Sequence, residues 1–324
     1  MMNRNVVYVV GLGPGDSQFL TAQAAAALDA ADVLCGYTVY VELIRARYPG
    51  KEICATGMTK EIDRCRWALQ TAQSGKTVAL VCSGDAGVYG MASPLLELAP
   101  AYPGVEVEII PGLTAALSGA AVLGAPLAHD FCVVSLSDRL TPWAVIEKRL
   151  ACAAVGDFCL ALYNPSSKGR ADYLAKAVRI LLANGKAPYT VCGTVRNIGR
   201  TGQTARLLTL AELEKIEVDM FTTVFVGNAA TKAQNGKMVT PRGYHGSHRS
   251  AGRRRNDRPA AQCEPLCRCD PPLCDRGNAQ YPCGGWGSRG GIPPPAAPCQ
   301  HPAGRQCRVC RSRRCRSVFA GQAR

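Results

Sequence analysis

The chain has 324 residues, enough for two ordinary domains and a sizeable core. It carries 38 basic and 24 acidic residues, and because 15 Arg and four acids lie after Tyr244, residues 1–244 hold 23 bases and 20 acids. A nearly neutral body gives no reason to expect a nucleic-acid partner. No apolar run approaches the roughly 18 residues of a membrane helix, so we expect no membrane partner either.

The 17 cysteines also divide at Tyr244, with eight before it and nine after it. The eight in the body include no C-x-x-C pair, and several lie inside apolar runs typical of strands. Buried, unpaired thiols are typical of a reducing compartment. We therefore expect a cytoplasmic protein.

The first predicted strand, residues 6–10, ends in a glycine-rich turn, GLGPGD at residues 11–16, and a predicted helix follows with Asp16 or Ser17 as its cap. Bare backbone at the start of a helix lets a cofactor approach main-chain N–H groups. The dinucleotide fingerprint is G-x-G-x-x-G, but Asp16 stands at its last position and Pro14 removes one donor. An acid suited to NAD binding, Asp32, is present, but its context fits poorly. The turn is therefore interpreted as a site for a cofactor other than NAD. The alternative is a tight strand-to-helix turn that binds no ligand.

Strand-like and helix-like segments alternate along the body, which predicts an α/β fold. The predicted strands are 6–10, 77–82, 105–110, 131–136, 158–163, 189–195 and 222–226. The predicted helices are 21–31, 61–74, 114–123, 142–151, 171–183 and 210–216. A segment rich in Gly, Ala and Pro at 111–130 is the expected connection between two lobes of similar size. We predict an N-terminal α/β lobe of residues 1–120 and a C-terminal α/β lobe of residues 121–244.

Two further glycine-rich turns follow predicted strands. The first, SGDAGVYG at residues 83–90, places Asp85 at the carboxyl end of a strand, where open α/β sheets bind ligands. The alternative is that Asp85 only bonds its own backbone. The second, PGLTAA at residues 111–116, starts a helix of small residues, with Thr114 able to cap that helix and face a ligand.

The order of these three turns resembles the tetrapyrrole methylases, which transfer methyl groups from S-adenosylmethionine (SAM) to corrin precursors and related substrates. The resemblance covers residues 6–244. Later motifs are similar to one branch, the precorrin-3B and cobalt-factor III C17-methyltransferases: HDF at 129–131, SLSD at 135–138, LYNPSSKGR at 162–170 and NGKMVTPRGY at 235–244. The implied reaction is methylation of C17 of a tetrapyrrole with ring contraction, in cobalamin biosynthesis. Methylation at a different carbon is the alternative.

The resemblance also implies two α/β lobes with SAM in the cleft between them, and a homodimer. It places nine residues around the cofactor: Pro14, Gly84, Asp85, Val88, Thr114, Ala115, Tyr163, Arg196 and Asn228. Pro14 would lie on the floor of the cleft. Tyr163, Arg196 and Asn228 would line the side toward the adenine.

Ring contraction implies proton transfers on the macrocycle, and we expect His129, Asp16 or Asp130 to take part. His129 is favoured because an imidazole titrates near neutrality. The alternatives are that His129 only holds a loop and that Asp16 only caps a helix. Candidates for pairing with the carboxylates of the substrate, or else solvated surface cations, are Lys168, Arg170, Arg196 and Arg200.

Residues 245–324 contain six Leu, Ile, Val or Phe against ten Pro and ten Gly. Such a segment cannot bury enough apolar surface to offset the entropy of ordering it, so we expect a disordered tail. Its composition matches a GC-rich gene read in a shifted frame, so our leading hypothesis is a frameshift product or an unselected extension. The alternatives are a metal module, for which paired C-x-x-C knuckles are missing, and a nucleic-acid adaptor, for which interleaved aromatic residues are missing. We expect no metal site.

Overall fold

The computed structural model describes residues 5–167 and 169–244. The predictions for residues 245–324, and the candidate role of Lys168, lie outside the described residues. The described residues belong to one compact unit that contains two five-stranded sheets. Within this part of the chain, no helix is both long enough and apolar enough to cross a membrane.

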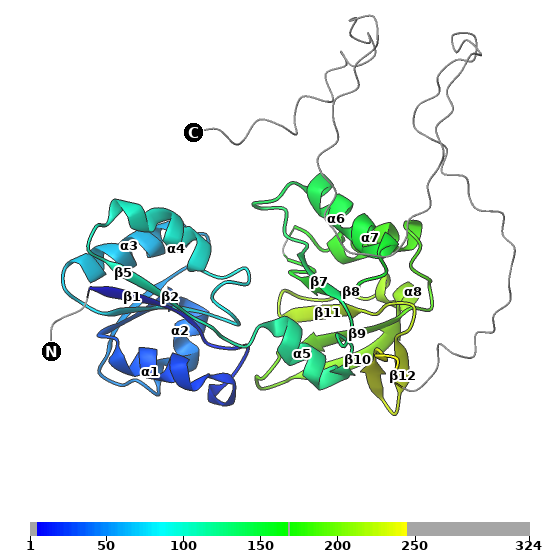
Figure 1. The fold of residues 1–324 in the computed structure, drawn as a ribbon, viewed down its shortest axis with the longest axis horizontal. Helices are drawn as coiled ribbons and strands as arrows, with labels where there is room; N and C mark the ends of the chain where they lie inside the picture. The colour runs from blue at the N-terminus through cyan, green and yellow to red at the C-terminus, as the bar shows by residue number, and fades with distance from the viewer. Residues whose placement is uncertain (1–4, 168, 245–324) are drawn as a thin grey trace, which may run out of the picture. The chain divides into compact units, whose positions relative to one another are not determined.

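The first sheet is entirely parallel, in the order β3-β2-β4-β1-β5. Its strands are β1 (Val6–Gly11), β2 (Val33–Tyr37), β3 (Glu52–Thr56), β4 (Val78–Cys82) and β5 (Glu106–Ile110). Figure 1 shows two helices on each face, which are α1 (Ala22–Ala30) and α2 (Thr38–Arg45) on one, and α3 (Glu61–Gln73) and α4 (Ala92–Leu98) on the other. Short 3-10 helices complete the lobe: η1 (Ser17–Phe19) and η2 (Ala99–Ala101). Because the strands are parallel, all their carboxyl ends lie at one edge of the sheet.

Strand β1, which lies between β4 and β5, is buried on both faces. Val7 and Val9 pack beneath α3 and α4, whereas Val10 packs with α1 and α2. A strand covered on both faces carries a continuous apolar run instead of an alternating one. This burial explains the run VVYVV from which the sequence predicts the strand.

The long helix after the first turn lies where the sequence predicts it, but its cap differs from the predicted one. Residues 17–19 form the 3-10 helix η1, capped by Asp16, and α1 begins only at Ala22. The cap of α1 is Thr21, whose hydroxyl accepts from the Ala24 N–H at 3.0 Å. The expectation that Asp16 or Ser17 caps the long helix is therefore corrected: Asp16 caps the short turn in front of it.

The second sheet has the order β10-β9-β11-β8-β7, and only β7 and β8 run parallel. Its strands are β7 (Phe131–Ser135), β8 (Cys159–Tyr163), β9 (Val191–Arg196), β10 (Thr204–Thr209) and β11 (Thr222–Val226). One face carries α6 (Trp143–Val155), α7 (Tyr173–Ala183) and α8 (Leu210–Leu213). The other carries α5 (Ala115–Leu123) and a small sheet of β6 (Gly124–Ala125), β12 (Lys232–Gln234) and β13 (Lys237–Val239).

Helix α5 follows β5 of the first sheet but packs against β9, β10 and β11 of the second. Its small side chains allow this close approach, since a Cβ on Gly119 would lie 2.8 Å from the Phe225 ring. The predicted lobe boundary at residue 120 falls inside this helix. By packing, α5 belongs with the second sheet.

Candidate active site

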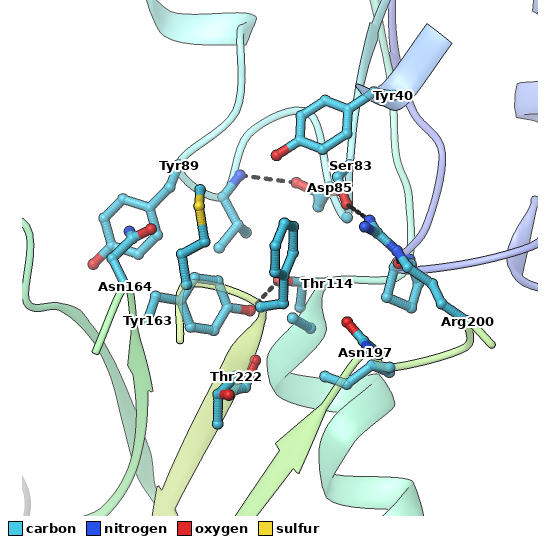
Figure 2. A pocket seen from close by; sticks show the side chains of 18 residues that line it. Tyr40, Ser83, Asp85, Tyr89, Thr114, Tyr163, Asn164, Asn197, Arg200 and Thr222 are labelled. Carbon is cyan, nitrogen blue, oxygen red and sulfur yellow. Dashed lines mark hydrogen bonds between the residues drawn. The ribbon is translucent and has the colours of Figure 1, made fainter. Parts of the chain in front are cut away.

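A pocket lies where the carboxyl ends of β1, β4 and β8 meet the start of α5. Figure 2 shows that its wall takes side chains from both sheets. Residues from the first lobe and the start of α5 are Pro14, Tyr40, Ser83, Gly84, Asp85, Val88, Tyr89, Thr114 and Ala115. Residues from the second lobe are Tyr163, Asn164, Asn197, Ile198, Arg200, Met220, Phe221, Thr222 and Thr223.

The three glycine-rich turns contact one another through their backbones. Gly13 and Gly84 exchange two main-chain hydrogen bonds, of 3.0 and 2.7 Å, and both have left-handed φ angles of 77° and 72°. A Cβ on Gly112 would lie 2.2 Å from the Gly84 carbonyl oxygen, and one on Gly11 would lie 2.7 Å from the Gly112 nitrogen. Side chains at Gly112 or Gly11 would force the turns apart.

Asp85 holds two of these turns together with its carboxylate. Its Oδ1 accepts from the N–H groups of Gly87 and Val88, at 2.8 and 3.0 Å. Its Oδ2 accepts from the Gly112 N–H at 2.9 Å, across 27 residues of sequence. Charge-assisted bonds of this kind are among the stronger ones in proteins. Asp85 thus bonds its own loop, as the alternative interpretation allowed, and also the third turn.

Tyr163, at the carboxyl end of β8, joins the second sheet to the start of α5. Its hydroxyl accepts from the Ala116 N–H at 2.6 Å and shares a hydrogen bond with Thr114 Oγ1. Burial raises the pKa of Tyr163, against the opposing effect of these two hydrogen bonds. Thr114 occupies the cap position of α5 but makes no capping bond of its own. The expected cap is therefore supplied by Tyr163 instead.

Tyr89 reaches from the second turn to the edge strand β7. Its hydroxyl donates to the Val133 carbonyl at 3.2 Å and accepts from the Ser135 N–H at 3.1 Å. Its ring lies 5.7 Å from that of Tyr163. The phenol therefore satisfies two backbone groups that an edge strand leaves open, and it connects the two lobes beside the pocket.

A second connection between the lobes runs through the loop after β9. Arg200 Nε donates to the Pro14 carbonyl at 2.8 Å, and Nη2 donates to Ser83 Oγ at 3.2 Å. The Asp16 N–H donates to the Gly199 carbonyl at 2.9 Å. Burial lowers the pKa of the Arg200 guanidinium, with a smaller opposing effect from Tyr40.

Residues with the strained, left-handed backbone conformation are concentrated at this pocket. Among the described residues, six that are not glycine have positive φ, and three of these line the pocket: Tyr89 at 55°, Asn164 at 52° and Asn197 at 52°. Such conformations persist where the surrounding structure holds them, commonly at ligand sites. The concentration of strain supports this pocket as the functional site.

Comparison with known proteins gives the family. Residues 6–214 match the family model of the Tetrapyrrole (Corrin/Porphyrin) Methylases. The chain belongs to the tetrapyrrole methylases. This methylase is 48% identical over 237 residues to the probable cobalt-factor III C(17)-methyltransferase of Salmonella typhimurium, an alignment that covers 73% of this chain and 98% of the relative.

Solved structures agree with this assignment. The crystal structure of the methyltransferase CobJ is 40% identical, with a TM-score of 0.68, and the match covers 72% of this methylase and 99% of that chain. A uroporphyrin-III C-methyl transferase from Thermus thermophilus, complexed with S-adenyl homocysteine, is 27% identical with a TM-score of 0.55 over 68% of this methylase and 91% of that chain.

Seven of the nine predicted cofactor residues of the methylase line one pocket: Pro14, Gly84, Asp85, Val88, Thr114, Ala115 and Tyr163. Arg196 and Asn228 do not. Arg196 is exposed at the end of β9, where Nε donates to Asp219 Oδ2 at 2.6 Å. Asn228 follows β11 at the end of that strand away from Thr222, and its Oδ1 accepts from the Ala230 N–H.

The predicted proton-transfer residues of the methylase do not line the pocket. His129 and Asp130 are exposed just before β7, and the five residues of that strand separate them by roughly 17 Å from its pocket-side end. Asp16 lies beside Pro14, but its carboxylate accepts from the Gln18 N–H at 3.0 Å and caps η1.

Sequence reasoning missed several residues that line the pocket of the methylase, among them Tyr40, Ser83, Tyr89, Asn164 and Asn197. Arg200 was expected either to pair with carboxylates of the substrate or to be a solvated surface cation, and the structure places it in the pocket wall. Arg170, which was expected in the same role, instead pairs with Asp138 at 3.0 Å. The asparagines carried a usable signal, since Asn directly after a strand tolerates the left-handed conformation.

Proposed function

We propose that this methylase transfers the methyl group of SAM to C17 of cobalt-factor III or precorrin-3B, with ring contraction, in cobalamin biosynthesis. The observation that carries the proposal is the pocket formed by the three glycine-rich turns, in a chain 48% identical to the Salmonella enzyme over 98% of that enzyme's length. Methylation of a different tetrapyrrole carbon is the alternative.

Several features of the pocket support SAM as its ligand. Gly84 presents bare backbone, with nothing closer than 3.8 Å to the position of a Cβ, so a ligand can approach the main chain there. Asp85 supplies an acidic side chain, and Tyr163 and Tyr89 supply aromatic wall. We propose Pro14, Gly84, Asp85, Val88, Thr114, Ala115 and Tyr163 as the residues that hold SAM, whose sulfonium supplies an activated methyl group.

We propose that positioning is the main catalytic contribution of these residues. In-line placement of two reacting groups is worth roughly 7–11 kcal/mol at best. The links that Tyr89 and Arg200 make between the lobes fix the pocket walls relative to each other, and the strained turns resist rearrangement. Because Asp85 is occupied by three N–H groups, we assign it to holding the turns and not to proton transfer.

Titration of S-adenosylhomocysteine (SAH) into the full chain by isothermal calorimetry tests the cofactor. We expect saturable binding with one site per chain. A folded protein that binds no SAH would contradict the proposal. A radiolabelled methyl-transfer assay with cobalt-factor III and, separately, uroporphyrinogen III then tests the substrate, and preferential labelling of uroporphyrinogen would favour the alternative.

We also propose a cytoplasmic homodimer. Eight free cysteines in the described residues support a reducing compartment, and the dimer rests on the family resemblance. Light scattering of the purified chain, which gives the mass in solution, tests the oligomeric state, and a monomeric mass would contradict it.

A further inference from the structure

Arg200 is the cation in the wall of the pocket, and among the described residues it pairs with no carboxylate. The acid in the same wall, Asp85, is directed at backbone N–H groups. Other half-buried or buried cations of the second lobe have acidic partners: Arg170 pairs with Asp138 and Lys186 with Asp157. Arg200 therefore differs from them in having no partner for its charge.

The guanidinium of Arg200 retains unused donors. It carries five N–H groups. Nε donates to Pro14 and one Nη2 hydrogen donates to Ser83, so both hydrogens of Nη1 and one of Nη2 have no partner in the described part of the chain. Parallel N–H groups on Nη1 and Nη2 match the two oxygens of a carboxylate. Figure 2 shows the side chain lying along the pocket wall and reaching Ser83.

An unpaired cation in a partly dehydrated pocket is unfavourable, because burial removes water that the charge would otherwise hold. The lowered pKa of Arg200 reflects this burial. A guanidinium would also repel the sulfonium of SAM if nothing negative lay near it. Both costs are removed when an anionic group occupies the space beside Arg200.

We propose that Arg200 binds a carboxylate of the ligand that fills this pocket, with Pro14 and Ser83 holding the guanidinium in place. The proposal rests on the proposed function, under which two ligands bring carboxylates: the amino-acid part of SAM and the acidic side chains of the tetrapyrrole. The chemistry of recognition is the same for both. The experiment below distinguishes them.

The test compares wild type with Arg200→Gln, and with Arg206→Gln as the matched control, because Arg206 is exposed on β10 and does not line the pocket. Three probes are titrated by calorimetry into the full chain. They are SAH, its decarboxylated analogue S-adenosyl-3-thiopropylamine, and uroporphyrin III. The analogue lacks only the carboxylate, so it reports on every other part of the cofactor site.

If Arg200 binds the carboxylate of the amino-acid part of SAM, Arg200→Gln lowers the affinity for SAH at least tenfold and changes the affinity for the analogue less than twofold. If Arg200 binds a tetrapyrrole carboxylate, the same variant lowers the affinity for uroporphyrin III at least tenfold and leaves the affinity for SAH unchanged. In either case Arg206→Gln behaves as wild type. Arg200→Lys, which keeps the charge, recovers part of the lost affinity.

Two results would overturn the inference while leaving the proposed function intact. One is unchanged affinity of Arg200→Gln for SAH and uroporphyrin III. The other is equal weakening of SAH and its analogue with uroporphyrin III unaffected, which would mean that Arg200 only supports the walls. Should the Gln variant fail to fold, the Lys variant decides: an equal loss for SAH and its analogue overturns the inference, and a loss confined to one carboxylate ligand supports it. If folded wild type bound neither SAH nor uroporphyrin III, both proposals would be overturned.

Discussion

Asp85 shows how one side chain can hold two turns of a pocket together. Three N–H groups from two turns converge on its two oxygens. The position of Gly112, and with it the start of α5, depends on this carboxylate. Sequence reasoning placed Asp85 in the pocket but could not find the bond to Gly112, because nothing in the sequence indicates which distant backbone a carboxylate meets.

Replacing Asp85 with Ala should leave these N–H groups without their acceptor. We expect Asp85→Ala to lower the free energy of unfolding by about 2–3 kcal/mol, and to weaken SAH binding at least tenfold because the turns separate. Urea unfolding and calorimetry measure the two effects. Asp63→Ala is the control, since Asp63 makes only exposed ion pairs on α3 and should lose less than about 0.5 kcal/mol. Equal losses in the two variants would contradict this account of Asp85.

The first two glycine-rich turns are predictable from sequence because the strands before them, β1 and β4, are conspicuous apolar runs. Strands β2 and β3 gave no such run: β2 has a glycine at Gly36, and β3 is a half-exposed edge strand. Strand β10 is also exposed at the edge of its sheet. The side chains of β3 and β10 are largely half-exposed or exposed, so these strands show little of the apolar pattern that predicts a strand. The pairing of these strands depends on contacts that a local sequence window does not contain.

Among the glycines at which the three turns contact one another, Gly112 has the least room for a Cβ. A Cβ there would lie 2.2 Å from the Gly84 carbonyl, so backbone must shift. We expect Gly112→Ala to destabilise the protein by about 3 kcal/mol and to abolish SAH binding. Gly57→Ala is the control, because nothing lies within 4 Å of its Cβ position. A Gly112→Ala variant as stable as the control would show that the turns are not closely packed.

The hydrogen bond between Tyr89 and β7 should protect the Ser135 N–H from hydrogen exchange. Removing the hydroxyl in Tyr89→Phe leaves the Ser135 N–H without its acceptor. Hydrogen–deuterium exchange should therefore become faster at Ser135 and stay unchanged at Cys159, which bonds elsewhere. Tyr189→Phe, at an exposed tyrosine, should leave Ser135 as in wild type. Unchanged exchange at Ser135 in Tyr89→Phe would contradict the link between the lobes.

Because of the buried thiols, the free energy of unfolding of the whole protein should fall as the pH rises through the alkaline range. Burial raises the pKa of Cys82 and of Cys192 to about 12, from an ordinary value of 9.0. The folded protein therefore keeps these protons at a pH where the unfolded chain has lost them, and stability falls as the pH rises from about 9 toward 12. Urea unfolding between pH 8 and 11 measures the decline. It should be less steep in Cys82→Ala, and an equal slope in that variant would contradict the role of Cys82.

The family, the α/β fold and seven of the pocket residues follow from motifs in residues 6–244, because three turns in a fixed order carry much more information than any one of them. The links between the lobes do not follow, since Tyr89, Tyr163 and Arg200 each bond to backbone far away in the sequence. The proton-transfer candidates illustrate the same limit. His129 was selected by its chemistry, whereas its position is set by the direction of β7.

The account is tested most directly by identifying the carbon that receives the methyl group. Incubation of the full chain with cobalt-factor III and SAM labelled with ¹³C in the methyl group, followed by NMR of the product, locates the label. We predict one new ¹³C methyl group, attached to C17 of a ring-contracted macrocycle. A label on any other carbon, or no transfer by folded protein that binds SAH, would contradict the proposed function.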